Sequence, residues 1–233
     1  MKQTNTIRGN ELRYHRQLDL VPMDKLAEHS VTVVGLGAGG RQVAMLLASM
    51  GVTNATLVDF DTVEITNIST QGYLEEDVGK AKVEAAKSQW LRVNARANIL
   101  CQQDYVGKET RMGDTIFCCV DSMASRKMLW EMAGKEAWYW ADGRMGEEVV
   151  RVLTAYSPLS RRYYESTLVS DEECREVRCT ARGTLYMAYL SSSLLVGGFA
   201  RRLRDIPVAP DVCFSMTTDC CIVKDGKQAA APK

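Results

Sequence analysis

A glycine turn between a short apolar run and a helical pattern constrains this fold more than any other feature. The run Val31–Val34 is rich in β-branched residues and predicts a buried strand. A helical pattern over residues 42–47 comes after the turn, and Gly51 stands where a helix C-cap is expected. The turn itself has the spacing G-x-G-x-x-G, with Gly35, Gly37 and Gly40. Strand, glycine turn and helix in this order are typical of a nucleotide-binding βαβ unit.

Each glycine in the turn has its own expected role. Gly35 permits the tight turn, Gly37 lets the backbone approach a phosphate, and Gly40 allows close packing at a helix N-terminus, whose free N–H groups attract anions. A second strand over residues 55–58 ends in Asp59, a carboxylate placed to hold ribose hydroxyls. The alternative is purely structural: a tight turn that uses glycines, with Asp59 capping another turn.

The rest of the chain alternates strand and helix patterns. We expect helices over residues 12–29, 79–93 and 183–200, and strands over residues 97–101, 115–120, 138–141 and 149–156, the last of them parallel. One face of the 79–93 helix would carry Val83, Ala86, Trp90 and Val93. This order predicts a Rossmann-like α/β fold, with a mostly parallel sheet, helices on both faces, and a C-terminal crossover segment and strand.

The sequence predicts a single domain over residues 11–223 without internal repeats. Within it, the charged stretch 157–182 is expected to be an irregular crossover, and residues 212–223 to supply a last strand or hairpin. Residues 1–10 are predicted to form a flexible head and residues 224–233 a disordered tail. The uncharged segment 183–200 contains serines and glycines, which favour a buried core helix over a membrane span.

Composition argues against several kinds of partner. The 29 Lys and Arg balance the 29 Asp and Glu, so no global field favours nucleic acid or an anionic membrane. The eight cysteines contain no C-x-x-C spacing. The adjacent pairs Cys118-Cys119 and Cys220-Cys221 would point to opposite strand faces, so we expect them in the core rather than in disulfides or around a zinc ion. Without an apolar signal segment, a reducing, cytoplasmic setting is expected.

Five short motifs resemble those of the ThiF/MoeB adenylyltransferases and of the adenylation domains of ubiquitin-activating enzymes. In chain order they are RYHRQ (13–17), DFDTV (59–63), NISTQ (67–71), GKAK (79–82) and CVDS (119–122). No single motif is decisive, but the resemblance runs from about Leu12 to Arg204. It implies an enzyme that uses ATP and Mg²⁺ to adenylate the C-terminal carboxylate of a small ubiquitin-like or sulfur-carrier protein ending in glycine.

The resemblance also implies roles for individual residues. Those expected to bind the nucleotide are Gly35, Gly37, Gly40, Asp59, Asn67, Lys82, Asp121 and Ser122. Asp121 would in addition hold Mg²⁺, and Arg16 would reach into the site of a partner subunit, which implies a homodimer. Attack of a carboxylate on a phosphate needs positioning and charge neutralisation rather than a strong base. A chain with only two histidines, His15 and His29, suits that chemistry.

Two departures from the family pattern affect these expectations. Relatives have Asn-x-x-Arg-Gln, whose arginine binds phosphate, whereas this chain has Thr70 in the arginine's place. Another cation must then contact the phosphates, and Arg13 and Arg41 are the candidates. The paired C-x-x-C motifs that hold zinc in many bacterial relatives are also missing, so we predict no structural zinc.

A second chemistry is suggested at Cys179. Residues 177–182, VRCTAR, resemble the element around the catalytic cysteine of ubiquitin-activating enzymes. Arg178 and Arg182 flank the thiol and favour its thiolate form, which could attack an acyl-adenylate and form a thioester. A structural cysteine, or a reaction that stops at adenylation, is the alternative. Cys174 is the fallback nucleophile.

Other functions stay open from the sequence. An NAD-dependent oxidoreductase would use the same glycine turn, although no acid or base for hydride transfer is identified. A member of the superfamily could instead adenylate a peptide terminus or a modified tRNA, and Thr70 leaves a non-catalytic nucleotide sensor conceivable. The sequence does not name the carrier, the final acceptor, or a conjugating enzyme that follows.

Overall fold

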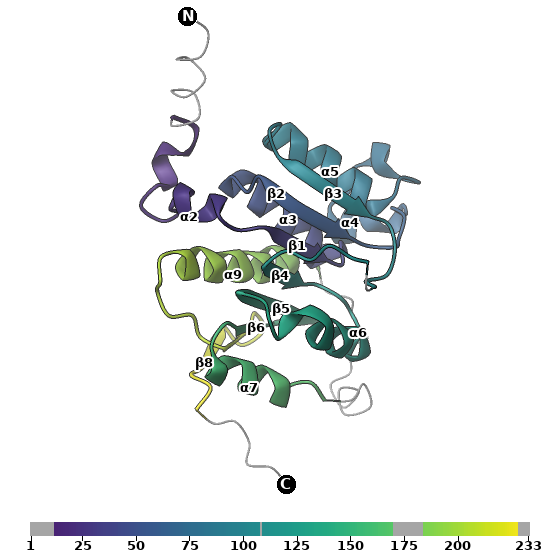
Figure 1. Ribbon diagram of the computed structural model, residues 1–233. Helices are drawn as coiled ribbons and strands as arrows, with labels where there is room; N and C mark the ends of the chain where they lie inside the picture. Colours follow the sequence, from purple (N-terminus) through teal and green to yellow (C-terminus); the bar gives the residue numbers. More distant parts are fainter. Residues whose placement is uncertain (1–11, 108, 170–183, 228–233) are drawn as a thin grey trace, which may run out of the picture.

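An eight-stranded sheet organises the chain, which the computed structural model describes over residues 12–107, 109–169 and 184–227. Its strands are β1 (Val31–Val34), β2 (Asn54–Val58), β3 (Asn98–Gln102), β4 (Thr115–Cys118), β5 (Tyr139–Gly146), β6 (Val149–Ala155), β7 (Asp211–Ser215) and β8 (Cys220–Lys224). In space they follow the order β3-β2-β1-β4-β5-β6-β7-β8 (Figure 1). Pairs from β3 to β5 are parallel, and pairs from β5 to β8 are antiparallel.

Helices cover both faces of the sheet. They are α2 (Met23–Ala27), α3 (Ala38–Met50), α4 (Thr66–Gln71), α5 (Lys82–Val93), α6 (Met123–Leu129), α7 (Pro158–Ser166) and α9 (Leu185–Leu203), with short turns η1 (His15–Gln17), η2 (Glu75–Asp77) and η3 (Trp130–Gly134). On one face α3 lies between α5 and α9 (Figure 1), and their side chains form the larger core with Val33 and Leu57. On the other face α6, η3 and α7 pack against Val34 and Val58. The expected mostly parallel α/β sheet with helices on both faces is confirmed.

The segment over residues 12–29 is not the single helix that we expected. Residues 12–14 are helical, η1 and a turn follow, and the five-residue α2 comes next. Pro22 is the N-cap of α2 and has extended backbone angles. Because proline lacks an N–H and disfavours helical geometry in the residue before it, a continuous helix cannot pass through this position.

The crossover also differs from the expectation. Residues 158–166 form α7 rather than irregular structure, with Pro158 in its first turn and Ser157 as its N-cap, accepting a hydrogen bond from the Ser160 N–H at 3.2 Å. The strand before it, β6, is antiparallel and not the last parallel strand. Only Glu147 and Glu148 connect it to β5, whereas a parallel pair requires a crossover of a dozen or more residues.

The C-terminal hairpin corrects a prediction about the cysteines. Cys118 is buried as expected, but Cys220 and Cys221 are exposed, because they lie on the edge strand β8, all of whose residues are exposed. That strand includes Lys224, which we had assigned to a disordered tail. Two other elements are shorter than expected: β4 ends at Cys118, and α5 begins at Lys82, after Gly79 with its φ of +87°.

The helix α9, which contains most of the uncharged segment 183–200, is largely buried against the sheet and α3, with Leu195 and Phe199 fully inaccessible. Across the described ranges, no helix is both long enough and apolar enough to cross a membrane.

Candidate functional site

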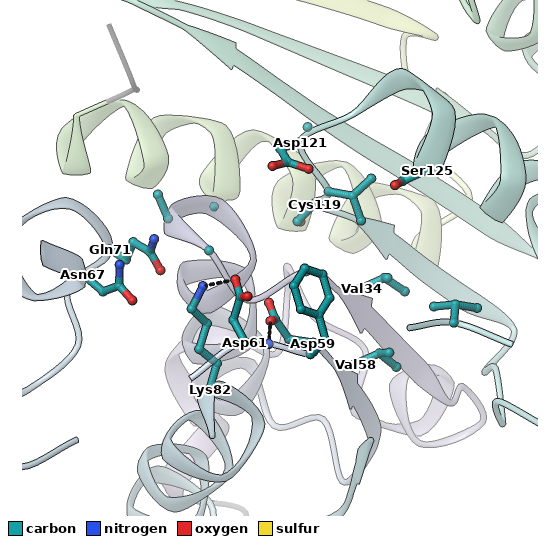
Figure 2. A pocket seen from close by; sticks show the side chains of 18 of the residues that line it. Val34, Val58, Asp59, Asp61, Asn67, Gln71, Lys82, Cys119, Asp121 and Ser125 are labelled. Atoms are coloured by element: carbon teal, nitrogen blue, oxygen red, sulfur yellow. Dashed lines mark hydrogen bonds and ion pairs between the residues drawn. The ribbon is translucent and has the colours of Figure 1, made fainter. Parts of the chain in front are cut away.

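A pocket of about 740 Å³ opens where the carboxyl ends of β1, β2 and β4 meet the N-terminus of α3. Open α/β sheets bind ligands in this place. Several residues selected from the sequence line it, namely Gly35, Gly37, Asp59, Asn67, Lys82 and Asp121 (Figure 2). Since they come from segments far apart in the chain, the fold assembles most of the predicted nucleotide site.

The glycines of the turn meet different constraints. Gly35 has a φ of +84°, and a Cβ there would lie 2.6 Å from the carbonyl oxygen of Cys119. A Cβ on Gly40 would collide with the carbonyl oxygen of Gly35, whereas nothing lies within 4 Å of one on Gly37. Gly35 and Gly40 are therefore required for close packing, and Gly37 exposes its backbone to the pocket. Gly40 itself does not line the pocket.

Asp59 links the glycine turn to the loop after β2. One carboxylate oxygen accepts a hydrogen bond from the Leu36 N–H at 2.5 Å, and the other accepts from the Asp61 N–H at 2.8 Å. Burial raises the pKa of Asp59, an effect that these hydrogen bonds and Lys82 oppose. Asp59 thus caps a turn, as the structural alternative expected. Asp59 also lines the pocket, and its contact with a ribose stays a prediction.

Lys82 is a fixed cation at the pocket wall. Its ammonium lies 2.8 Å from the carboxylate of Asp61, and only 7% of its side chain is exposed. The main chain pairs the same two residues, because the Lys82 N–H donates to the Asp61 carbonyl at 3.0 Å. The sequence suggested no role for Asp61, although the residue lies in the DFDTV motif. Figure 2 shows the pair beside Asp59.

Asn67 and Asp121 lie on different walls of the pocket (Figure 2). The buried Asn67 accepts a hydrogen bond from the Glu64 N–H at 2.9 Å, which orients its side-chain amide. Asp121 is exposed just after β4. Ser122 does not line the pocket; its hydroxyl oxygen caps α6 by accepting from the Ser125 N–H at 3.1 Å.

Asp121 suits a magnesium ion that is delivered with phosphates. Its accessible carboxylate is a hard oxygen ligand, the kind that Mg²⁺ prefers. In the part of the chain that the structure describes, no three His, Cys, Asp or Glu side chains are grouped to hold a metal ion. Mg²⁺ commonly takes one or two carboxylates and fills its remaining positions with water and substrate phosphates, so the site does not need such a group.

The two candidate phosphate contacts, Arg13 and Arg41, and the predicted partner-site residue Arg16 do not line the pocket. Arg13 and Arg16 are exposed near the opposite end of α3, where a Cβ on Gly51 would lie 2.9 Å from the ring of Tyr14. Since α3 has 13 residues, this end lies about 20 Å from the glycine turn. Arg41 is buried and stacks on the ring of Tyr73, with its guanidinium carbon 5.2 Å from the ring centre.

A buried ion triad beside the pocket has no counterpart among the sequence predictions. Asp142 is inaccessible and binds the Nε of Arg126 at 2.9 Å and the Nε of Arg144 at 2.8 Å, while the Tyr164 hydroxyl donates to it at 3.1 Å. Burial alone would raise the pKa of Asp142, but the two arginines hold it below its usual range. Arg126 lines the pocket. The sequence does contain one signal for this site, because Asp142 directly follows the apolar run 137–141.

The other side of the pocket is apolar and aromatic. Val34 and Val58 lie opposite Asn67 and Gln71 in Figure 2, and Val106 and Leu129 extend this wall. At its edge Phe60 and Tyr105 stack, with ring centres 4.3 Å apart, and both rings are at least half exposed. A pocket with one apolar wall and one polar wall is suited to a ligand that joins a flat base to a polar chain.

Carboxylates outnumber cations around the pocket. The acidic residues that line it are Asp59, Asp61, Glu64, Asp104 and Asp121, whereas the basic ones are Lys82 and Arg126. Both of these cations are already paired with a carboxylate. The described lining of the pocket is therefore acidic overall, and a ligand with several phosphates finds only two cations there.

The cysteine in the pocket wall is a poor nucleophile. Cys119 lines the pocket, but burial raises the pKa of its thiol to about 12, with a further contribution from Asp142. Burial raises the pKa of Cys118 as well. The predicted nucleophile Cys179 and the fallback Cys174 lie outside the described residues.

Comparison with known proteins identifies a matching family. A model of the ThiF family matches residues 12–216. The chain is 34% identical over 129 residues to the molybdopterin-synthase adenylyltransferase of Escherichia coli (strain K12), a match that covers 51% of this chain and 52% of that protein. It is 28% identical over 143 residues to ubiquitin-like modifier-activating enzyme 5 of Caenorhabditis elegans, covering 54% of this chain and 34% of that protein. The matches thus span about half the length of these curated relatives, or less.

Solved structures with the same fold are more distant in sequence. PaaA superposes with a TM-score of 0.77 at 18% identity, covering 93% of this chain and 82% of that one. Escherichia coli MccB, solved with ATP, superposes with a TM-score of 0.73 at 16% identity, covering 91% and 71%. At these identities the likeness shows the shared fold.

Proposed function

Because the chain belongs to the ThiF family, whose model matches residues 12–216, we propose that it is an ATP- and Mg²⁺-dependent adenylyltransferase. Its proposed substrate is the C-terminal carboxylate of a small ubiquitin-like or sulfur-carrier protein that ends in glycine. The names of two relatives support this kind of substrate, one referring to molybdopterin synthase and the other to a ubiquitin-like modifier. A peptide terminus or a modified tRNA is the alternative substrate.

The observation that carries the proposal is the convergence of the glycine turn, Lys82 and Asp121 in one pocket. In the proposed reaction a carboxylate oxygen of the carrier bonds to the α-phosphorus of ATP, while the bond from that phosphorus to the bridging oxygen of pyrophosphate breaks. The products are an acyl-adenylate and pyrophosphate. No base has to remove a proton from the attacking carboxylate, so the site must mainly position the reactants and neutralise charge.

Each wall of the pocket has a proposed task. The apolar wall would hold the adenine base, and Asp59 the ribose. The backbone at Gly37, with Asn67 and Lys82, would bind the phosphates. Asp121 would hold Mg²⁺, which would offset the charge of the triphosphate and of the departing pyrophosphate.

The excess of carboxylates supports a homodimer. Among the described residues that line the pocket, five carboxylates stand against two cations, so one copy presents a net negative lining to a triphosphate. Arg16 is exposed about 20 Å from the pocket of its own chain, where it is free to approach the pocket of another copy. We therefore infer that Arg16 acts in the partner subunit's site.

Pyrophosphate exchange tests the adenylation step. The protein is incubated with ATP, Mg²⁺, labelled pyrophosphate and a β-grasp protein ending in Gly-Gly, and label entering ATP is counted. We expect exchange that depends on the carrier, and a loss of roughly 10²–10³ in rate for Lys82→Gln because a fixed cation at the developing charge is removed. Asp121→Asn should also lose activity.

A neighbouring lysine provides the matched control. Lys80 has a side chain that is 50% exposed and does not line the pocket, so Lys80→Gln should exchange at the wild-type rate. Exchange that persists in Lys82→Gln, or that is equally low in both variants, contradicts the assigned site. Thermal stabilisation by NAD rather than by ATP and Mg²⁺ would instead favour the oxidoreductase alternative.

A second assay addresses the proposed thioester. In this step the Cys179 thiolate would attack the acyl carbon of the adenylate and release AMP. Cys179→Ala should keep pyrophosphate exchange but lose a carrier adduct that dithiothreitol cleaves, whereas Cys174→Ala should keep both. An adduct that survives in Cys179→Ala, and is lost in Cys174→Ala, would assign the fallback nucleophile.

A further inference from the structure

The helix that brings Asn67 and Gln71 to the pocket has little apolar anchorage of its own. With six residues, α4 is too short to be stable in isolation. The segment around it contributes to a separate cluster of only three buried residues, Val63, Tyr73 and Ala85. Polar contacts must therefore contribute strongly to where α4 lies.

Tyr73, two residues after α4, reaches the glycine turn. Its ring is 2% exposed, and its hydroxyl donates a hydrogen bond to the carbonyl oxygen of Leu36 at 2.8 Å. Burial raises the pKa of Tyr73, so the hydroxyl remains a donor at all ordinary pH values. One side chain thus connects the segment that carries Asn67 to the turn that exposes Gly37.

Arg41 contacts the ring of Tyr73. Its guanidinium stacks on the Tyr73 ring and donates to the side-chain carbonyls of Gln42, at 3.2 Å, and of Gln89. Gln89 in turn donates to the carboxylate of Asp77 at 2.7 Å, which extends the contact to η2. Within the described ranges no carboxylate lies at ion-pair distance from Arg41, although its side chain is buried.

Gly72 shows how closely Arg41 approaches the end of α4. Gly72 has a φ of +79°, and a Cβ there would lie 3.0 Å from Nη1 of Arg41 and 3.1 Å from Nε2 of Gln42. The same Nε2 donates to the carbonyl oxygen of Gln71 at 2.8 Å. Burying a guanidinium without a charged partner has an unfavourable desolvation free energy, which the other contacts of Arg41 must offset.

We propose that Tyr73 and Arg41 form a latch, meaning the Tyr73–Leu36 hydrogen bond and the Arg41–Tyr73 stack, that fixes α4 against the glycine turn and thereby sets the affinity for a triphosphate. The latch rests on the proposed function, because it requires that the pocket binds ATP. Neither residue lines the pocket, so both are positioning residues. If the two residues only stabilised the fold, substituting them would lower stability, and the affinities for different ligands would keep the same ratio.

Calorimetric titration of three probes separates these roles. Tyr73→Phe keeps the ring and removes the hydroxyl. We expect it to bind ATP–Mg²⁺ and inorganic tripolyphosphate–Mg²⁺ about tenfold more weakly, the effect of losing roughly one hydrogen bond. Adenosine has no phosphates, so Tyr73→Phe should bind it within about twofold of the wild type.

Tyr156→Phe is the matched control. The Tyr156 hydroxyl also donates to a backbone carbonyl, that of Val208 at 2.9 Å, but it does not line the pocket and has no contact with the latch. This variant should bind all three probes like the wild type. Hydrogen exchange adds a local measurement: amides over residues 66–78 should exchange faster in Tyr73→Phe, while those of β2 stay unchanged.

The outcomes distinguish the latch from the proposed function. An equal loss for all three probes, or unchanged affinities with a lower melting temperature, overturns the latch. A wild-type protein that does not bind ATP–Mg²⁺ overturns the proposed function, and the latch with it. Arg41→Lys keeps the charge but removes the guanidinium that lies over the Tyr73 ring, so it should reproduce the selective loss. Wild-type affinity for tripolyphosphate in this variant would exclude Arg41 from the latch.

Discussion

We expect Asp142→Asn to lower the free energy of unfolding by about 3–5 kcal/mol, the usual cost of removing one partner of a buried ion pair. The substitution leaves the guanidinium groups of Arg126 and Arg144 without their counter-charge, and the Arg126 side chain is only 6% exposed. For a domain of this size each kcal/mol corresponds to about 2–4 °C, so the melting temperature should fall by about 6–20 °C.

Urea unfolding followed by tryptophan fluorescence measures this loss. Trp130 and Trp140 pack against Tyr164, which itself hydrogen-bonds to Asp142, so the signal reports on the surroundings of the triad. Glu131→Gln is the matched control, because it makes the same chemical change in an exposed pair with Lys135 and should give no resolvable shift. A loss below about 1 kcal/mol in Asp142→Asn would refute the reasoning, because removing the carboxylate leaves two buried guanidinium groups without a counter-charge.

The pH dependence of the unfolding free energy tests the contribution of Asp142 independently. Because the arginines hold the pKa of Asp142 below its unfolded value of about 3.9, the triad stabilises the protein fully above that pH. The contribution is lost as the pH falls through the folded pKa. Wild-type stability should therefore decline below about pH 4 toward that of Asp142→Asn, whereas the difference between the two proteins should stay constant between about pH 6 and 8.

Two further predictions concern the glycine turn and the cysteines. Gly40→Ala should lower stability by about 1–3 kcal/mol and abolish stabilisation by ATP–Mg²⁺ in a thermal shift assay, because the new methyl group collides with the Gly35 carbonyl oxygen. Gly197→Ala, on an open face of α9, is its control and should be neutral or stabilising; equal behaviour of the two variants would contradict the packing argument. In brief native alkylation at about pH 8, Cys220 and Cys221 should react while Cys118 and Cys119 stay protected, since the first two are exposed and burial raises the pKa of the other two. Peptide mapping checks this, and labelling of Cys119 at the rate of Cys221 would be the contrary result.

Local patterns predicted the centre of the fold well. The glycine turn and Asp59 follow rules that act over a few residues, and the structure places both at the pocket. The errors at Pro22 and Ser157-Pro158 were also local: a proline interrupts one helix, and a serine–proline cap begins another. These signals were present in the sequence, but the spacing of apolar residues outweighed the first and the charge of the segment outweighed the second.

Long-range partners could not be predicted in this way. Asp142 meets Arg126, and Tyr73 meets Leu36, only after separate elements have packed, and no spacing rule connects them. The exposure of Cys220 and Cys221 depends on β8 being the edge strand, which is a property of the whole sheet. Pocket-lining residues that belong to a shared motif were therefore easier to find than the residues that contact them from other elements.

The two-residue connection between β5 and β6 also has a consequence for how the chain folds. Hairpins of this kind form within microseconds, because their partners are close in sequence. The pocket instead requires β1 to pair with β4, and α3, β2, α4, α5 and β3 lie between these two strands in the chain. Such distant pairings form slowly, since a long loop must close first. We therefore expect the pocket, and with it the proposed nucleotide binding, to form late in refolding, after the β5–β6 hairpin.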